Sequence, residues 1–262
     1  MKQNPILSKV SFDLYTAQMK WSIWYISILL FVHITIIIIS VNLTGTFGDF
    51  LAFSYGSSKV YMLVIGILSA YAFLTFYVNH GITRKDYFKG TAISALAISI
   101  SLAIIAAVLN VIEYVILRLI NIEHVLERSM ENSHIQNDDQ SISIDLTGMM
   151  VSGSSFIDSS NWLVSLIVYS MTIFIAYLIG WLIGVGYYRF GWIIGFGFIA
   201  LAIIMSTLLD LLWGNELAEP LSYWLAFDLN IPLVVSILGT LVLIGMILWF
   251  IRFLTRDVPI KM

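Results

Sequence analysis

The sequence predicts an all-α membrane protein with six transmembrane helices, an N-terminal amphipathic interfacial helix and both termini in the cytoplasm. Of its 262 residues, 60% are hydrophobic and 11% are charged, whereas a soluble domain carries about 25% charged residues. Six apolar runs of about 20 residues each have the length that a helix needs to cross the hydrocarbon core. The basic residues gather at alternating ends of these runs, as in a chain that crosses a membrane repeatedly.

The first predicted element is an amphipathic helix that precedes the first span. Its apolar residues recur at helical spacing along one face, at Ile6, Leu7, Val10, Leu14, Ala17 and Trp21. Such a helix is typical of the inner membrane interface. Residues 1–20 are therefore expected to form a connecting helix, and residues 21–262 a six-helix transmembrane domain. The connecting helix is either a passive anchor or a lever that responds when the first span moves.

The apolar runs give six predicted spans, and the basic residues orient them. The spans are Trp21–Val41, Val60–Val78, Ala92–Leu117, Trp162–Ile183, Trp192–Leu212 and Ile231–Phe250. Of the 13 Lys and Arg residues, three fall on one side, at Lys59, Arg118 and Arg128. The remaining ten fall on the other, at Lys2, Lys9, Lys20, Arg84, Lys85, Lys89, Arg189, Arg252, Arg256 and Lys261. Because basic residues accumulate on the cytoplasmic side, both termini are expected there.

Two polar segments are expected on the outer side. The loop over residues 118–161 is long and acidic. Residues 213–230, "WGNELAEPLSYWLAFDLN", are too short and too polar to span the membrane. Irregular backbone at membrane depth must be buried in protein or line water. The second segment is therefore predicted to be a re-entrant or interfacial helical hairpin.

The sequence offers no motif for catalysis on this chain. It has no cysteine, so thiol nucleophiles and thiolate metal sites are excluded. It contains neither a phosphate-binding G-x-x-x-x-G-K-[ST] loop nor the zinc motif H-E-x-x-H. Glu123, His124, Glu127 and His134 could hold zinc, but a solvated helix face fits their spacing better. No catalytic or metal residue is predicted, and a transport subunit is favoured over an enzyme.

Three ionisable side chains fall inside predicted spans, where such residues are functional candidates. His33 is expected to be a neutral imidazole hydrogen-bonded to a neighbouring helix. Glu113 and Asp210 lie near the outer ends of their spans. They are expected to be solvated or to pair with a nearby group such as Arg118. The inner halves of the spans hold no chain of ionisable groups, which argues against a proton-coupled transporter.

Small residues recur every four positions in two regions. One series runs along the third span, at Ala95, Ser99, Ala103 and Ala107. The other consists of the pairs Gly180 with Gly184 and Gly191 with Gly195. Small side chains allow membrane helices to approach closely. These patterns predict helix packing within the bundle or, alternatively, a seam between two copies.

The polar segment between the second and third spans, "NHGITRKDYFKG", predicts a turn followed by a short helix. Gly81 suits the turn, Thr83 can cap the helix, and Asp86 lies in its first turn, where a negative charge favours the helix dipole. One interpretation is a loop that only sets the topology. However, three basic residues beside the aromatic side chains of Tyr87 and Phe88, expected to be exposed, are typical of an anchor for another protein.

At this segment the chain resembles the permeases of ABC-2-type ABC exporters. The shared features are six spans, an amphipathic entry helix, the inner segment "GITRKDYFKG" and an outer hairpin before the sixth span. In that family the segment after the second span is a coupling helix that docks on a separate ATPase chain. The resemblance implies a coupling helix made of Gly81, Ile82, Thr83, Arg84, Lys85, Asp86, Tyr87 and Phe88. In it, Gly81 would provide the turn, Arg84 and Lys85 the polar contacts, and Tyr87 with Phe88 an apolar plug.

The resemblance also implies the partners and the setting. Two permease subunits, identical or different, would work with two ABC ATPase subunits in a bacterial plasma membrane. This chain would hold no cofactor, and ATP and Mg²⁺ would bind to the ATPase. The long acidic outer loop and the size are most similar to the membrane subunit of exporters of phenol-soluble modulins, which are amphipathic toxin peptides. Related permeases expel other antimicrobial peptides or lipids.

The second span carries a group of aromatic residues in its inner half. They are Tyr71, Phe73, Phe76 and Tyr77. As possible lining of a pathway they suit a peptide with a large apolar face, although lipid contact or core packing also accounts for each of them. The alternative function is a peptide-binding immunity or sensor protein without transport. It would need no ATPase, and changes in residues 82–88 would leave it unaffected.

Overall fold

In the computed structural model, the described residues are 5–43, 49–120, 162–213 and 232–256. They form an all-helical bundle with six helices that are long and apolar enough to cross a membrane, as predicted. Most of the predicted outer loop and hairpin, and all four residues considered for zinc, lie outside the described residues.

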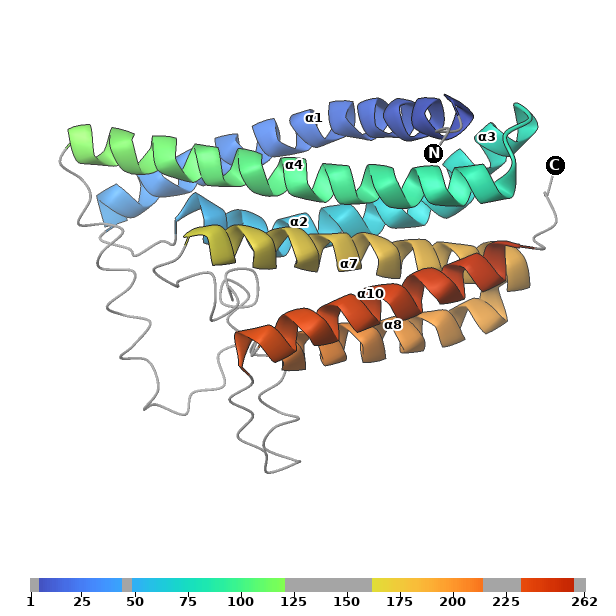
Figure 1. Cartoon of the computed structure of the whole chain (residues 1–262). Coiled ribbons are helices and arrows are strands. Elements are labelled where there is room, and N and C mark those ends of the chain that lie inside the picture. Colours follow the sequence, from blue (N-terminus) through green and yellow to red (C-terminus); the bar gives the residue numbers. More distant parts are fainter. Residues whose placement is uncertain (1–4, 44–48, 121–161, 214–231, 257–262) are drawn as a thin grey trace.

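The helices are named here in chain order (Figure 1). They are α1 (Pro5–Leu43), α2 (Phe50–Leu68), the π-helical turn η1 (Ser69–Phe73), α3 (Leu74–Asn79), α4 (Arg84–Leu119), α7 (Trp162–Phe190), α8 (Trp192–Trp213) and α10 (Leu233–Thr255). Residues 50–79 form one span interrupted only by the wider turn of η1. Each predicted span therefore corresponds to one helical segment.

The first helix combines two predicted elements. Helix α1 runs for 39 residues without a break, about 58 Å at 1.5 Å per residue. Val10, Leu14, Gln18 and Ser22 form a buried stripe along its first half, and His33 is buried further along the helix. The stretch predicted to be a separate connecting helix is thus continuous with the first span and packs against the same bundle. Its position in the membrane interface stays a prediction.

Two other helices begin earlier than the hydropathy predicts. Helix α2 starts at Phe50 rather than Val60, with the side chain of Asp49 accepting from the backbone of Ala52 as a cap. The expectation of a separate short helix after Thr83 is wrong, because α4 continues from Arg84 without interruption. Gly90 does not end the helix, and its missing side chain leaves room for Val10 of α1.

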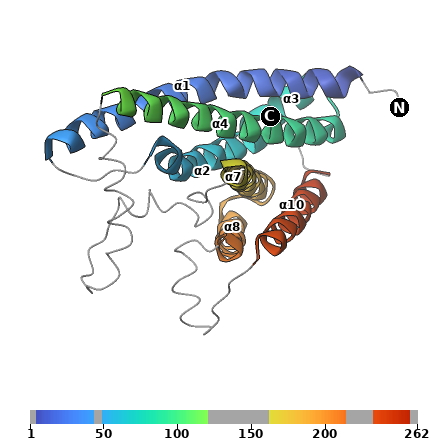
Figure 2. The ribbon, with the colours of Figure 1, turned by 60° about the vertical axis from the view of Figure 1, so that its left-hand side comes forward.

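Helix α7 lies at the centre of the bundle. Figures 1 and 2 show α1 and α4 together on one side of it, α2 beside it, and α8 with α10 on the other side. It is the most buried of the six spans, and its side chains from Thr172 to Leu182 are buried on all faces. A helix that is apolar all round is the expected sequence for such a position.

Two glycines bring the backbones of α2 and α7 into contact. A Cβ atom on Gly66 would lie 2.1 Å from the carbonyl oxygen of Tyr177, and one on Gly180 would lie 2.0 Å from that of Leu63. A Cβ on Gly184 would lie 2.6 Å from the side chain of Ala70. The pair Gly180 and Gly184 therefore packs within one copy of the chain rather than forming a seam between copies.

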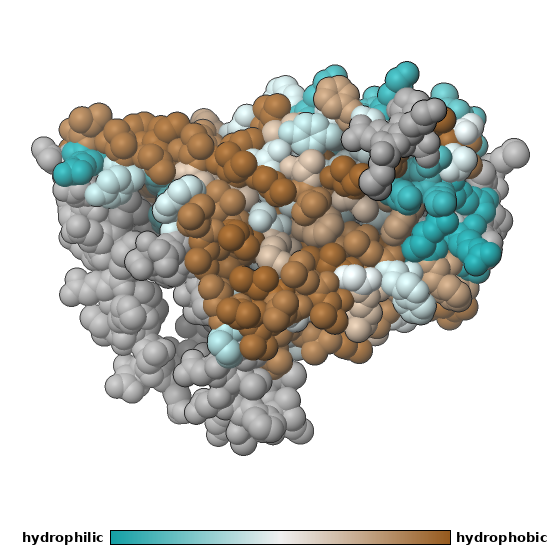
Figure 3. All heavy atoms as spheres, viewed as in Figure 1, coloured by the Kyte–Doolittle hydropathy of each residue, from teal (hydrophilic) through white to brown (hydrophobic). Residues whose placement is uncertain are grey.

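The surface separates into apolar and polar regions (Figure 3). Large apolar side chains are exposed along the helices, among them Trp24, Phe31, Ile193 and Val242. Hydrophilic residues gather at the end of the bundle where α3 meets α4 and where α10 ends. An apolar surface of this extent would be unfavourable in water, but it suits contact with the hydrocarbon chains of lipid.

The contact between α2 and α7 predicts a large effect of a single methyl group. Gly66→Ala should lower the thermal midpoint of the protein in detergent, since the new Cβ meets backbone that cannot move aside. We expect the free energy of unfolding to fall by about 1–3 kcal/mol, although alanine has a higher helix propensity than glycine. Gly245→Ala is the matched control, because nothing lies within 4 Å of its Cβ position. Equal midpoints for the two variants would contradict the close approach.

Candidate functional site at the turn between α3 and α4

The turn before α4 has a specific backbone geometry. Gly81 has φ 84°, a conformation that side chains disfavour. Its N–H donates to Val78 O, and the N–H of Ile82 donates to Tyr77 O. This pair of hydrogen bonds is a Schellman motif, which ends a helix on a glycine. The predicted role of Gly81 in the turn is confirmed.

The next residues start α4 with a cap. Thr83 has extended backbone, and its Oγ1 accepts from the N–H of Asp86 at 3.1 Å. The same hydroxyl donates to Asp86 Oδ2 at 2.7 Å. The predicted cap is therefore confirmed. The turn is held at both sides by hydrogen bonds, so it joins α3 and α4 rigidly.

The basic residues of the segment differ in their surroundings. Arg84 is half-buried, and its Nη1 donates to the carbonyl oxygen of Arg256 at 3.2 Å. Lys85 and Lys89 are exposed. The guanidinium thus ties the start of α4 to the end of α10, while the two lysines remain available to a partner.

The prediction that both aromatic residues are exposed is wrong. Tyr87 is only 1% exposed, and its hydroxyl donates to the carbonyl oxygen of Ser69 at 2.5 Å. Phe88 is half-buried, 5.5 Å from the ring of Trp181 and 5.7 Å from the guanidinium carbon of Arg252. The Tyr87 ring also lies against those of Tyr77 on α3 and Trp181 on α7, so α4 is packed into the bundle from its first turn. Tyr87 cannot serve as a plug in another protein.

Ser69 is a junction of three helices. It begins the π-helical turn η1, a type of helix defect that often lies at functional sites. Its Oγ lies 2.5 Å from the hydroxyl of Tyr177 on α7, and that hydroxyl accepts from Gln18 Nε2 on α1 at 3.2 Å. Through Tyr87, the start of α4 joins the same network. Hydropathy alone gave no indication of this junction, although single polar residues in apolar helices are a usable signal.

The four aromatic residues predicted to line a pathway have different neighbours. Tyr71 is exposed, and its ring makes an edge contact with that of Tyr188. Phe73 stacks on Trp21, with 5.7 Å between the ring centroids. Tyr77 is buried and donates to Asp13 Oδ2. Their role as the lining of a pathway stays a prediction.

The fourth of these residues, Phe76, lies near the end of the span. It is 53% exposed, and its ring centroid lies 4.3 Å from that of His80. Phe76 and His80 therefore lie at the end of α3 and just after it, and Thr83 and Lys85, which are also exposed, follow within five residues of His80. An exposed aromatic ring close in sequence to basic residues fits the anchor that was expected at Tyr87 and Phe88.

A second group of polar residues lies at the opposite end of α2. His33 Nε2 lies 2.7 Å from Glu113 Oε1, which confirms a hydrogen bond from His33 to a neighbouring helix. Glu113 Oε2 accepts from the N–H of Phe50 at 2.8 Å, and Asn110 accepts from that of Leu51 at 3.1 Å. Glu113 is thus paired with α1 and α2, rather than solvated or bound to Arg118. It caps α2 from outside the helix.

Asp210 is likewise not solvated. It is 5% exposed, and its Oδ1 lies 4.0 Å from Lys59 Nζ. The ammonium group also lies 4.3 Å from the centroid of the Tyr55 ring. These contacts join α8 to α2. In the parts of the chain that the structure describes, no three His, Cys, Asp or Glu residues are grouped as metal ligands.

In comparisons with known proteins, no protein-family model, no curated protein and no solved structure matches this chain.

The capping role of Glu113 predicts a large loss of stability on its removal. Glu113→Ala leaves His33 and the N–H of Phe50 without their carboxylate partner. We expect the free energy of unfolding to fall by about 3 kcal/mol. It is measured by titration with SDS, with tryptophan fluorescence as the readout. Glu113→Gln retains an acceptor for Phe50 and should lose less. Arg118→Ala, at an exposed position of the same helix, serves as the control. A loss as small as that of the control would contradict the role.

Proposed function

We propose that the chain is the membrane-spanning permease subunit of an ATP-driven ABC exporter. A separate ABC ATPase, in two copies, hydrolyses ATP with Mg²⁺, and a second permease copy or a paralogue completes the transporter. The substrates are amphipathic or antimicrobial peptides of the phenol-soluble modulin type. The protein lies in a bacterial plasma membrane with both termini in the cytoplasm.

The observation that carries the proposal is the turn between α3 and α4. It presents exposed Phe76, His80, Thr83 and Lys85 on a backbone held by hydrogen bonds. A loop that only sets topology needs basic charge but no rigid form. A rigid turn with an exposed ring and lysines is suited to docking in a groove of a partner.

The contacts behind this surface suit the transmission of movement. Arg84 contacts α10 and Phe88 contacts α7. Tyr87 contacts the π-helical turn η1. A partner that moves the turn therefore acts directly on three other helical elements. This is the mechanical requirement for a permease that is driven by ATP hydrolysis on another chain. A peptide-binding immunity protein would have no use for it.

Docking is tested at exposed Lys85. Lys85→Glu should sharply reduce co-purification of an ABC ATPase with the tagged chain from its native membrane, as measured by mass spectrometry. Lys85 is preferable to Arg84, because Arg84→Glu would also break the contact with α10. Lys20→Glu, at another exposed lysine, should retain the ATPase. Without any ATPase bound to the unaltered chain, the immunity or sensor function would replace our proposal.

Transmission is tested at Tyr87. Tyr87→Phe removes one hydroxyl from the junction at Ser69 and leaves the exposed docking residues unchanged. We expect the ATPase to co-purify normally, whereas peptide export should fall several-fold. The net loss of stability should be about 1 kcal/mol, so the variant should still fold. Normal export by this variant would argue against transmission through Ser69.

A further inference from the structure

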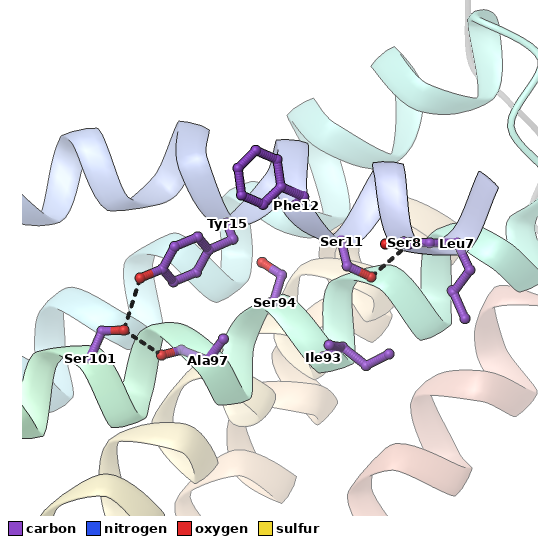
Figure 4. Close-up of a pocket in the computed structure, with 9 residues that line it drawn as sticks. All are labelled: Leu7, Ser8, Ser11, Phe12, Tyr15, Ile93, Ser94, Ala97 and Ser101. Carbon is purple, nitrogen blue, oxygen red and sulfur yellow. Dashed lines mark hydrogen bonds between the residues drawn. The ribbon is translucent and has the colours of Figure 1, made fainter. Parts of the chain in front are cut away.

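A groove lies between the first turns of α1 and the inner half of α4 (Figure 4). It has a volume of 480 Å³. Its apolar lining includes Phe12 and Ile93, which are 68% and 49% exposed. Its polar lining is made of hydroxyl groups, from Ser8, Ser11, Tyr15, Ser94 and Ser101. None of the described residues that line it carries a charge.

One hydroxyl in the groove has no partner within the described residues. Ser11 donates to Leu7 O at 2.9 Å, and the hydroxyls of Tyr15 and Ser101 lie 2.9 Å apart. Ser94 is 1% exposed, and its Oγ makes no hydrogen bond with any described residue. Figure 4 shows it directed from α4 toward α1, between Tyr15 and Ser11. An unpaired buried hydroxyl costs free energy, and an acceptor on a ligand would remove that cost.

Basic residues continue the edge of the groove toward the polar end of the bundle. Lys89 and Lys85 precede Ile93 by four and eight residues, so all three lie along one side of α4. Both lysines are exposed, and Lys89 lies about 6 Å from Ile93 along the helix axis. In the other direction, exposed Leu96 and Ile100 lead into the apolar surface. The groove therefore passes from positive charge through hydroxyls to an apolar region.

We propose that this groove binds an anionic phospholipid of the adjacent leaflet. Its phosphate would lie near Lys89, an ester carbonyl would accept from Ser94, and an acyl chain would lie along Ile93. Basic pockets between helices at the cytoplasmic side are suited to anionic headgroups. The order of charge, hydroxyl and apolar surface matches the order of groups along a glycerophospholipid. The site does not depend on which molecule the protein transports.

The test is native mass spectrometry of the delipidated full chain. It is titrated separately with phosphatidylglycerol and with phosphatidylcholine of the same acyl chains. We expect phosphatidylglycerol to bind at least about fivefold more tightly. Lys89→Gln should weaken the binding of phosphatidylglycerol about fivefold and leave the binding of phosphatidylcholine unchanged. Lys20→Gln, at an exposed lysine that lies away from the groove lining, should change neither.

Ser94→Ala separates binding from folding. It should weaken the binding of both lipids about fivefold. It should also raise the thermal midpoint of the lipid-free protein, since it removes an unpaired buried hydroxyl. A merely structural serine would lower that midpoint. Equal binding of the two lipids by the unaltered chain would overturn the proposal. So would equal effects of Lys20→Gln and Lys89→Gln, which would reduce the preference to general surface charge. Displacement of the lipid when two copies associate would assign the groove to a second copy instead.

Discussion

The direct contact between the backbones of α2 and α7 is the constraint on which the rest of the bundle depends. Gly66 and Gly180 leave no space for a side chain between the two helices. Apolar side chains gain little from leaving lipid for protein, so membrane helices associate through close packing and hydrogen bonds. The close approach supplies the packing. It also brings the polar side chains of both helices within hydrogen-bonding distance, because they lie along the same seam.

The hydrogen bonds along that seam follow from the approach. Ser58 on α2 lies 2.8 Å from the hydroxyl of Tyr169 on α7, and Ser69 bonds to Tyr177 further along the same helix. Each phenol would be costly if it were buried without a partner. Helix α1 then joins through Gln18 to Tyr177, and through Ser22 to Tyr61 at 3.0 Å. The polar groups therefore set the register of the helices as well as their contact.

The two ends of α2 are held in different ways, with consequences for movement. At its start, side chains from α4 and its own cap satisfy the backbone N–H groups of Phe50, Leu51 and Ala52. At its far end, η1 widens the helix, and the Ser69 carbonyl accepts from both Leu74 and Tyr87. The first end is anchored, whereas the second includes a change in helical winding beside the proposed docking turn. This asymmetry would direct any movement of the turn into the bundle.

The sequence by itself determined the number of spans, the turn at Gly81 and the cap at Thr83, because hydropathy and turn preferences are properties of neighbouring residues. It also indicated that Gly180 and His33 contact other helices. Only the tertiary structure decided that Tyr87 is buried while Phe76 is exposed, since that depends on how α3 and α4 pack against their neighbours. The pairing of Glu113 with His33 and Phe50 was decided in the same way. Glu113 is 80 positions from His33 and 63 positions from Phe50 in the chain, so they become neighbours only when three helices pack together.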